Sequence, residues 1–448
     1  MLRLLQQTSS STPTAAVAAS SRRIATSAFR KSDNFSGPGF GNVGGLRPKR
    51  DEGASKPNLV DQRQDPSGAP KTKAWFWSRE SPTPKIVPES EGALAIGTSP
   101  FHSAFATSDK LYTFGANQSS QLGRQNSTDP APDGWHLDLP MPVDQPLLGQ
   151  VARLSLGHQT THAITTDMKV WSWGHGGTFW RGSTGLGHGD TKSRSVPTLV
   201  EGVPGVIDAA SGERHNLVLC QDGRVFVSGN GDFGALGIGE VLDAADYKVL
   251  EYFSRDPEVM GQQLPNGVVK ISAGQNFSGA LTRQGQLFLW GHNGSGQLGL
   301  GLGQCLYEVF TRYPQPISDP FSRQGINIVD FACGDTHTVV LTESGVVYDW
   351  GMTLFVEPRS VTVASAWEAG IKNPQAVAAG DDWSTLHTAD GKLYVWGRPE
   401  SGCLLGTEQE TEVTAPTQVD PALFDNEAVV EVVCCGQQAM VLTRSDLP

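Results

Sequence analysis

Membrane-spanning segments, cysteine motifs and cofactor fingerprints are all missing from this sequence. No run of 18 apolar residues occurs in its 448 residues, so we expect no membrane-spanning helix. The six cysteines form neither a Cys-x-x-Cys pair nor a pairing framework, which favours buried thiols in a reducing compartment. A phosphate-binding loop, a dinucleotide fingerprint and a His-Glu-x-x-His motif are absent as well. The sequence therefore predicts a protein without catalytic residues, cofactor or metal.

Acidic residues are missing from the N-terminal segment. Residues 1–31 are rich in Ser, Thr and Ala, have no Asp or Glu, and contain five basic residues: Arg3, Arg22, Arg23, Arg30 and Lys31. This composition resembles a mitochondrial transit peptide, although a plain disordered tail is the alternative. We expect import into mitochondria, to the matrix or the matrix side of the inner membrane. Residues 32–72 are polar without an apolar period and are predicted to be a disordered linker.

The charge that remains without this segment is strongly negative. The formal net charge of the chain is −12, and removing the five positive charges of residues 1–31 leaves −17 on residues 32–448. An anionic surface repels phosphate backbones, so direct DNA or RNA binding is not expected. Basic protein surfaces are the better partners. Peripheral association with the inner membrane stays open.

Glycine and aromatic residues recur at fixed spacing after residue 72. Short segments end in Gly with aromatic residues three and one positions before it: 111–115, 170–174, 287–291, 347–351 and 393–397, with variants at 225–229 and 74–78. Alternation places both aromatics on one strand face, and the intervening positions are often apolar too. A strand apolar on both faces must be covered on both sides, as in stacked sheets.

Each of these segments follows a shorter apolar strand and a two-residue turn. Pairs such as Asp222-Gly223 and Asp390-Gly391 suit a primed hairpin turn. A further Gly precedes the upstream strand in every copy, at positions 97, 157, 212, 274, 334, 380 and 436. Several copies also carry a later Gly-Gln-Leu-Gly signature, such as 296–299. The copies therefore share one internal order.

The last copy is incomplete, and its missing part lies at the other end of the chain. Residues 432–446 match the first half of the repeat, and the chain ends before the Trp-Gly strand. Residues 74–77 (Ala-Trp-Phe-Trp) match that strand and have no first half before them. We therefore expect one sheet to be shared by the two ends, which closes a ring and removes exposed sheet edges.

The order Gly-x-x-His, apolar strand, Asp-Gly, aromatic strand with Trp-Gly, and Gly-Gln-Leu-Gly resembles the regulator-of-chromosome-condensation (RCC) repeat. Its clearest copies are 212–239 and 274–301, and the resemblance covers residues 73–446. It implies an all-β fold: a seven-bladed β-propeller closed by pairing of its N- and C-terminal strands in one blade. Together with the N-terminal segment, the chain resembles the mitochondrial branch of this family.

The histidines invite a metal site, but their repeat positions favour packing. His215 and His337 occupy the same slot, three residues after the repeat Gly, where other copies have Phe277, Trp383 and Ala439. A slot that accepts Phe or Ala is a packing position. His102 and His162 fall five residues after their Gly and need a longer loop.

A candidate interaction face consists of His215, Asp335, His337, Asp381 and Asp382. Its three aspartates are predicted in loops that join blades. Solvated loop ends are the plain alternative for the carboxylates. Two longer connections, 240–266 and 302–325, are either binding loops or neutral surface elaboration.

The resemblance implies two protein-binding functions. The first is a non-enzymatic assembly factor for inner-membrane respiratory complexes, particularly the cytochrome bc1 complex, or for the mitochondrial ribosome. Its partners would be respiratory-complex subunits or mitoribosomal proteins. The second is guanine-nucleotide exchange on a mitochondrial GTPase, which needs only a surface that favours the nucleotide-free state. No wedge motif of the exchange factors can be matched in this sequence.

Overall fold

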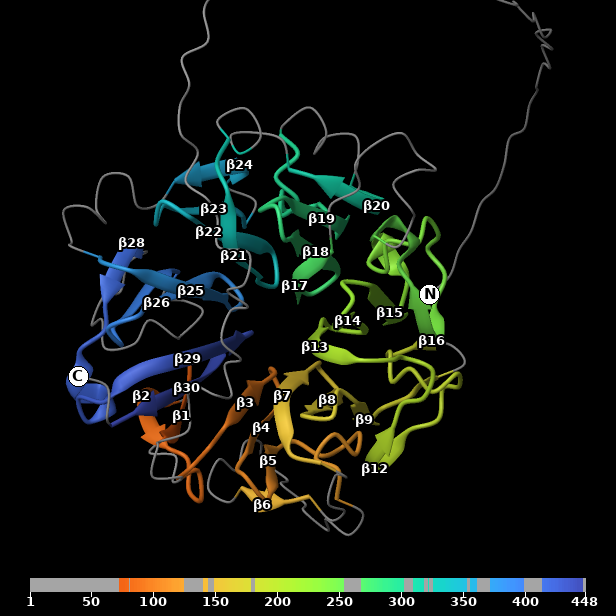
Figure 1. Ribbon diagram of the computed structural model, residues 1–448, viewed down its shortest axis with the longest axis horizontal. Helices are drawn as coiled ribbons and strands as arrows, with labels where there is room; N and C mark the ends of the chain where they lie inside the picture. Colours follow the sequence, from red (N-terminus) through yellow and green to blue (C-terminus); the bar gives the residue numbers. More distant parts are fainter. Residues whose placement is uncertain are drawn as a thin grey trace, which may run out of the picture. The chain divides into compact units, whose positions relative to one another are not determined.

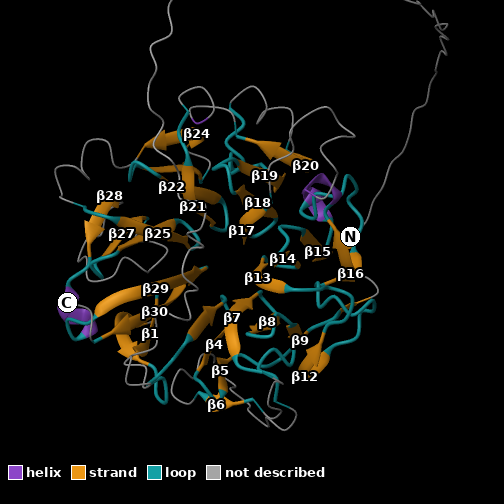
Figure 2. Cartoon of the chain, in the orientation of Figure 1, coloured by secondary structure: helices purple, strands orange, loops and turns teal. Residues whose placement is uncertain are grey.

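Seven four-stranded antiparallel sheets make up the described part of the computed structural model. All described residues belong to one unit, Lys56–Pro448. They are residues 72–79, 81–124, 140–143, 149–178, 182–253, 267–301, 309–317, 321, 325–352, 355–360, 371–398 and 413–445. The predicted transit peptide and all but the last residue of the predicted linker lie outside them. The sheets are arranged as blades around a central channel, so the predicted seven-bladed propeller is confirmed (Figures 1 and 2).

We number the blades by their innermost strands, which line the channel. For blades 1 to 7 these are β3 (Ala95–Thr98), β7 (Val151–Leu156), β13 (Val206–Ser211), β17 (Val268–Ala273), β21 (Ile328–Cys333), β25 (Pro374–Ala379) and β29 (Ala428–Cys435). The second strands are β4 (His102–Ala106), β8 (Thr160–Thr165), β14 (His215–Cys220), β18 (Phe277–Thr282), β22 (His337–Thr342), β26 (Trp383–Thr388) and β30 (Gln438–Arg444).

The outer half of each blade carries the aromatic segments. The third strands are β5 (Leu111–Gly115), β9 (Val170–Gly174), β15 (Val225–Gly229), β19 (Leu287–His292), β23 (Val347–Gly351), β27 (Leu393–Gly397) and β1 (Thr72–Ser78). The outermost are β6 (Met141–Pro142), β12 (Arg194–Leu199), β16 (Ala244–Val249), β20 (Phe310–Pro316), β24 (Phe355–Ser360), β28 (Val413–Gln418) and β2 (Ser81–Ile86). A small pair, β10 (Gly177–Thr178) with β11 (Gly182–Ser183), and the 3₁₀ turns η1 (Asp232–Gly234), η2 (Glu251–Phe253) and η4 (Pro421–Phe424) lie in connections.

Blade 7 is shared by the two ends of the chain, as the split repeat predicts. Strand β1 pairs with β30 along its whole length, from Thr72 opposite Arg444 to Ser78 opposite Gln438. In Figure 1 the orange β1 lies beside the blue β30. The indole of Trp75 donates to Thr443 Oγ1 at 2.8 Å, across 368 residues of sequence. The ring is therefore closed by an ordinary antiparallel ladder.

The turn between the second and third strands differs from the predicted primed hairpin. In blade 3, Gly223 N donates to Cys220 O at 2.9 Å and Cys220 N donates to Arg224 O at 2.9 Å. Of the two predicted turn residues only Gly223 has a positive φ, at 85°. This is a three-residue loop in which a type I turn ends on a left-handed glycine, a common alternative for hairpins. The glycine was predicted correctly, and the turn type was wrong.

The Trp-Gly and Gln-Leu-Gly signatures couple neighbouring blades. The indole Nε1 atoms of Trp173 and Trp350 each donate at 2.9 Å to the carbonyl of a Gln in the preceding blade, Gln121 and Gln297 respectively. The Gly that closes each signature packs against the same indole. Two motifs far apart within one repeat therefore meet at the boundary between blades.

Blades that depart from the repeat still form a hydrogen bond between neighbouring blades at this position, with a different donor or acceptor. Blade 3 has Ser228 in place of Trp, and its hydroxyl donates to Gly185 O of blade 2 at 2.9 Å. Blade 5 lacks the Gln-Leu-Gly signature, and the indole of Trp396 in blade 6 donates instead to Asp349 Oδ2 at 3.3 Å. Each departure from the repeat thus retains an acceptor for the buried donor.

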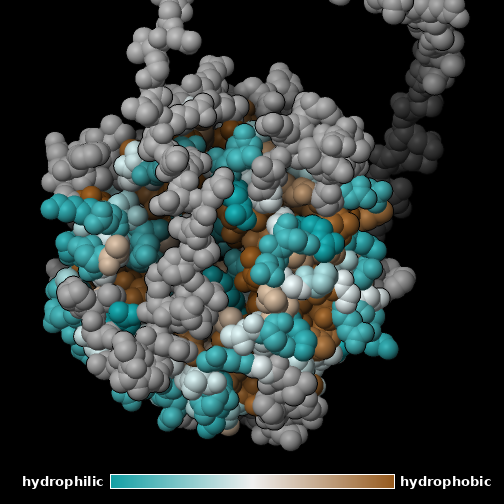
Figure 3. Space-filling model, viewed as in Figure 1, coloured by the Kyte–Doolittle hydropathy of each residue, from teal (hydrophilic) through white to brown (hydrophobic). Residues whose placement is uncertain are grey.

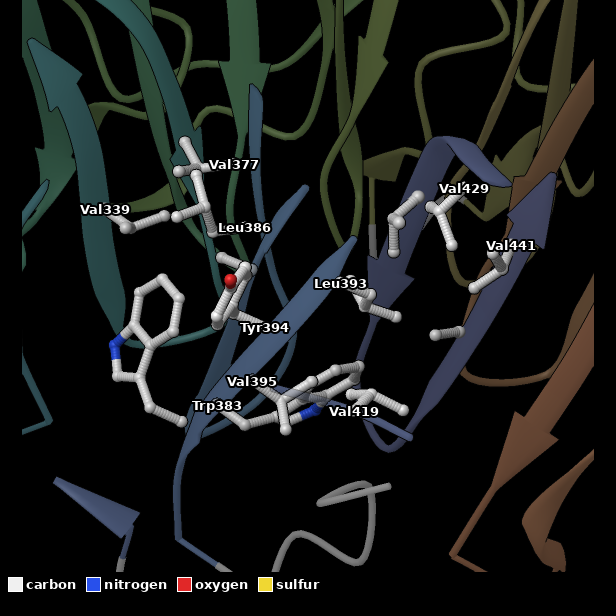
Figure 4. Packing of buried hydrophobic residues seen from close by; sticks show 14 of the residues in the cluster. Val339, Val377, Trp383, Leu386, Leu393, Tyr394, Val395, Val419, Val429 and Val441 are labelled. Atoms are coloured by element: carbon white, nitrogen blue, oxygen red, sulfur yellow. The ribbon is translucent and has the colours of Figure 1, made fainter. Parts of the chain in front are cut away.

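Apolar side chains fill the spaces between blades. One cluster joins blades 5, 6 and 7, and its members Val339, Trp383, Val395 and Val441 are completely buried (Figure 4). Burial of this kind contributes roughly 25 cal/mol per Å² of apolar surface. The ring is therefore held by packing between blades as well as by the closing ladder.

Candidate interaction face

The turns between first and second strands all lie at one end of the channel, which we call the hairpin face. These turns span residues 99–101, 157–159, 212–214, 274–276, 334–336, 380–382 and 436–437. The channel beneath them is a cavity of about 240 Å³ lined by residues of all seven innermost strands. Asp335, Asp381 and Asp382 are therefore in hairpins within blades 5 and 6, and the prediction that these loops join blades was wrong.

His215 and His337 lie beneath this face in the packed interior. They are 2% and 0% exposed, and burial lowers the pKa of each to about 4. His215 Nε2 and Ser278 Oγ of the next blade are hydrogen-bonded at 2.9 Å, and His337 Nε2 and Ser384 Oγ at 2.8 Å. Both rings pack so closely on the repeat glycines that a Cβ there has no room. These two histidines hold blades together, and the prediction that they belong to the interaction face was wrong.

The repeat position that His215 and His337 occupy is confirmed as a packing position. In three blades the residue at this position, or its distance from the repeat Gly, differs from the prediction. In blade 1 the turn begins at Ser99 rather than Gly97, because Ser99 N donates to His102 O at 2.9 Å, so His102 fills the slot without a longer loop. In blade 2 the residue opposite Gly174 is Thr160, and His162 lies two positions further along the strand. In blade 7 the residue opposite Ser78 is Gln438, where Ala439 was predicted.

Carboxylates gather above this packed layer. We call Glu213, Asp335, Asp381 and Asp382 the acidic rim. Glu213 and Asp335 line the mouth of the channel, and Asp335 N donates to Gly380 O of the next blade at 3.0 Å. Burial, together with repulsion from the other three carboxylates, raises the pKa of Asp335 to about 7. Burial and the charge of Asp382 also raise the pKa of Asp381.

The rim is only partly neutralised by nearby groups. Asp382 Oδ2 lies 3.8 Å from Arg398 Nη1, and Asp382 Oδ1 accepts a hydrogen bond from Thr336 Oγ1 at 3.4 Å. Asn276 Nδ2 donates to Glu213 Oε2 at 3.4 Å. The raised pKa of Asp335 shows that burial and crowding of negative charge outweigh these contacts at its position.

A second set of charges lies deeper, at equivalent positions of the innermost strands. Arg153 Nε of blade 2 lies 3.9 Å from Asp208 of blade 3, and Lys270 of blade 4 pairs with Asp330 of blade 5. Asp330 Oδ2 also accepts a hydrogen bond from Val377 N of blade 6 at 2.9 Å. These pairs join neighbouring blades along the channel wall.

Three members of the rim were predicted from the sequence, and the fourth, Glu213, was not. Glu213 follows Gly212 directly, just as Asp335 and Asp381 follow their own repeat glycines. This shared position is the signal that identifies it. The paired charges of the channel wall could have been found in the same way, since each lies two residues after the apolar residue that starts its strand.

The chemical groups that the rim offers are carboxylates. Among the residues that the structure describes, no group of three or more His, Cys, Asp or Glu side chains could hold a metal ion. Within the same residues, no helix is long and apolar enough to cross a membrane. What the arrangement can do is attract and hold cationic groups, such as lysine and arginine side chains of another protein.

Comparison with known proteins agrees with this architecture. Residues 66–442 match the family model described as RCC1-like domain. Human HERC2, an E3 ubiquitin-protein ligase, is 30% identical over 263 residues, which are 55% of this chain and 5% of that protein. The X-linked retinitis pigmentosa GTPase regulator of the dog is 29% identical over 343 residues, which are 63% of this chain and 32% of the relative. The chain thus spans less than a third of the length of either relative.

Solved structures show the same fold at low sequence identity. Yeast RCC1 (Prp20), solved with Kap60, superposes with a TM-score of 0.69 at 19% identity, covering 84% of this chain and 89% of that one. Human WBSCR16 gives a TM-score of 0.68 at 20% identity, covering 84% and 99%. With the family match extending over most of the propeller, the chain belongs to the family of proteins with an RCC1-like domain.

Proposed function

We propose that this protein is a non-enzymatic scaffold that holds basic segments of client proteins on its hairpin face. The observation that carries the proposal is the acidic rim, where carboxylates from blades 3, 5 and 6 converge at the channel mouth. Burying these charges close together costs free energy, as the raised pKa of Asp335 indicates. A lysine or arginine of a client would offset that cost, so the rim favours a cationic partner.

The proposed setting is the mitochondrion. The acid-free, Arg-containing residues 1–31 support import, to the matrix or the matrix side of the inner membrane. The clients would be subunits of respiratory complexes, in particular the bc1 complex, or proteins of the mitochondrial ribosome. The charge of −17 on residues 32–448 favours such basic clients over nucleic acid.

Guanine-nucleotide exchange on a mitochondrial GTPase is the alternative. Two comparisons favour it: one relative is named a GTPase regulator, and yeast Prp20p is described with binding properties to Gsp1p and histones. Exchange would use the same face, because it needs only tighter binding to the nucleotide-free GTPase.

Recovery of clients from intact mitochondria tests the proposal. The full-length precursor would be expressed as wild type and as the rim variant Glu213→Gln/Asp335→Asn/Asp381→Asn. The matched control is Asp167→Asn/Asp222→Asn/Asp390→Asn, which removes three carboxylates from the strand turns at the opposite end of the blades. Those carboxylates are exposed and pair with Lys169, Arg224 and Lys392.

We expect mitochondrial location, and loss of basic respiratory or ribosomal proteins from the rim variant alone. A cytosolic protein, or equal recovery by both variants, would contradict the proposal. Stimulated release of GDP from a mitochondrial GTPase, abolished in the rim variant and kept in the control, would favour the alternative.

A further inference from the structure

An exposed phenylalanine stands out in the loop that follows β15. The loops after the third strands of blades 1, 3 and 4 share one turn, in which Gly123, Gly237 and Gly299 each donate their N–H to the carbonyl of the residue three before. Counting back from these bonds, Phe233 of blade 3 takes the place of Ser119 and Ser295. Two blades thus have a small polar residue where the third has a large aromatic one.

The backbone at Phe233 is in the left-handed region. Its φ is +56°, whereas neither Ser119 nor Ser295 has a positive φ. A bulky residue rarely adopts this conformation, and the side chain is nevertheless 42% exposed. Strained residues of this kind concentrate at sites of function.

Phe233 belongs to a small group of side chains, which we call the aromatic patch: Phe233, His292, Val309 and Phe310. Its ring lies 4.7 Å from that of His292 and 6.4 Å from that of Phe310. Val309, next to Phe310, is 50% exposed. Arg312 lies over the Phe310 ring at 5.6 Å, so Phe310 is partly covered and Phe233 is the ring left open to a partner.

On the face of the propeller drawn in Figure 3, hydrophobic and hydrophilic residues are intermixed. The patch residue Phe310 was predicted to lie in the connection 302–325, and the structure places it at the start of strand β20. The end of that predicted binding loop is therefore part of a blade.

The patch is continuous with the acidic rim. His292 N donates to Asn276 O at 2.9 Å, and Asn276 Nδ2 in turn reaches Glu213 Oε2 at 3.4 Å. Phe233 is therefore connected to Glu213 through two intervening residues, His292 and Asn276. Asp232, which precedes Phe233 in the same turn, is exposed and adds a further carboxylate to this loop.

We propose that Phe233 is the apolar anchor of the client-binding face, and that it takes a segment that combines lysine or arginine with an aliphatic or aromatic residue. The basic side chains lie against the rim, and the apolar side chain packs on Phe233 and Val309. This inference rests on the proposed function and names the chemistry of its partner. A few well-packed anchor residues usually supply most of the affinity at protein interfaces.

Two synthetic peptides separate the anchor from the rim. The first alternates lysine with leucine, and the second, of the same length, alternates lysine with serine. Fluorescence anisotropy would be measured on the full-length protein, on Phe233→Ser and on the matched control Phe101→Ser. Phe101 is 41% exposed on the same face and packs against His158.

We expect the wild type to bind the leucine peptide roughly tenfold more tightly than the serine peptide, a preference lost in Phe233→Ser and kept in Phe101→Ser. Phe233→Gly should lose it too while melting no earlier than the wild type, because glycine relieves the positive φ. A preference that survives both Phe233 variants overturns the inference. If the rim variant weakens both peptides while Phe233→Ser changes neither, the proposed function stands and the anchor is wrong.

Discussion

The acidic rim and the packed layer beneath it are built from the same hairpins and have opposite properties. Asp335 and His337 are two residues apart, yet one lines the channel mouth and the other is completely buried. Burial raises the pKa of the carboxyl and lowers that of the imidazole, because it disfavours the charged form of each. At neutral pH the rim gathers negative charge, whereas the layer below stays neutral.

We therefore expect the rim to govern the binding of partners and the packed layer to govern the stability of the fold. Changes in the layer, including the closing strand, should affect folding, and changes at the rim should affect partners. Three predictions test the division, beginning with the largest effect.

Removal of residues 73–78 should abolish cooperative folding. It takes away most of β1, leaves one edge of β30 unpaired, and removes the buried side chains of Trp75 and Trp77. Thermal melting monitored by circular dichroism measures the effect, with removal of residues 1–31 as the control that should melt like the wild type. A cooperative transition at the wild-type temperature in the shorter chain would refute the closed ring.

Replacement of one buried histidine should make the protein more resistant to acid. The folded-state pKa of His337, about 4, is below the ordinary 6.5, so this group's contribution to stability is lost as pH falls from 6.5 towards 4. His337→Phe with Ser384→Ala introduces the Phe that blade 4 has in this slot and removes both partners of the hydrogen bond.

Relative to the wild type, this double variant should gain about 2 kcal/mol between pH 7.5 and pH 5. Urea denaturation at the two pH values gives the difference. An identical loss of stability in both proteins would show that His337 does not resist protonation.

Asp335→Asn should stabilise the protein slightly, with a defined pH dependence. The raised pKa means that the folded state holds this proton more tightly than the unfolded state, so ionisation lowers stability as pH rises from about 4 to about 7. The advantage of the variant should grow by about 1 kcal/mol from pH 5 to pH 7, after allowance for solvent screening, and level off above about pH 8. A variant less stable than the wild type at pH 8 would mean that Asp335 supports the fold.

The repeat made most of the fold predictable. Third-strand boundaries such as Leu111–Gly115 and Leu393–Gly397 follow directly from the aromatic spacing, and the split repeat predicted the pairing of β1 with β30. The turn type was missed because Asp-Gly suits more than one hairpin, and the ladder beside it decides which forms. The slots at Thr160 and Gln438 were missed because counting from glycine ignores differences in turn length.

The candidate site was less predictable. The residues Phe277 and Trp383 at the position of His215 and His337 predicted packing there, but the serine of the next blade that each histidine bonds was visible only in the structure. The rim depends on which turns face the same end of the channel, which the repeat implies. The aromatic patch depends on a positive φ at Phe233, which the sequence did not indicate.

The most direct test of the rim is the pH dependence of its affinity for a cationic peptide. Binding of the lysine–serine peptide would be measured by calorimetry between pH 6 and pH 8, at one ionic strength, for the wild type and Asp335→Asn. The wild type should bind several-fold more tightly as Asp335 ionises near its pKa of about 7, and the variant should show little change. Equal affinity at every pH in both proteins would contradict a cation-binding rim at the channel mouth.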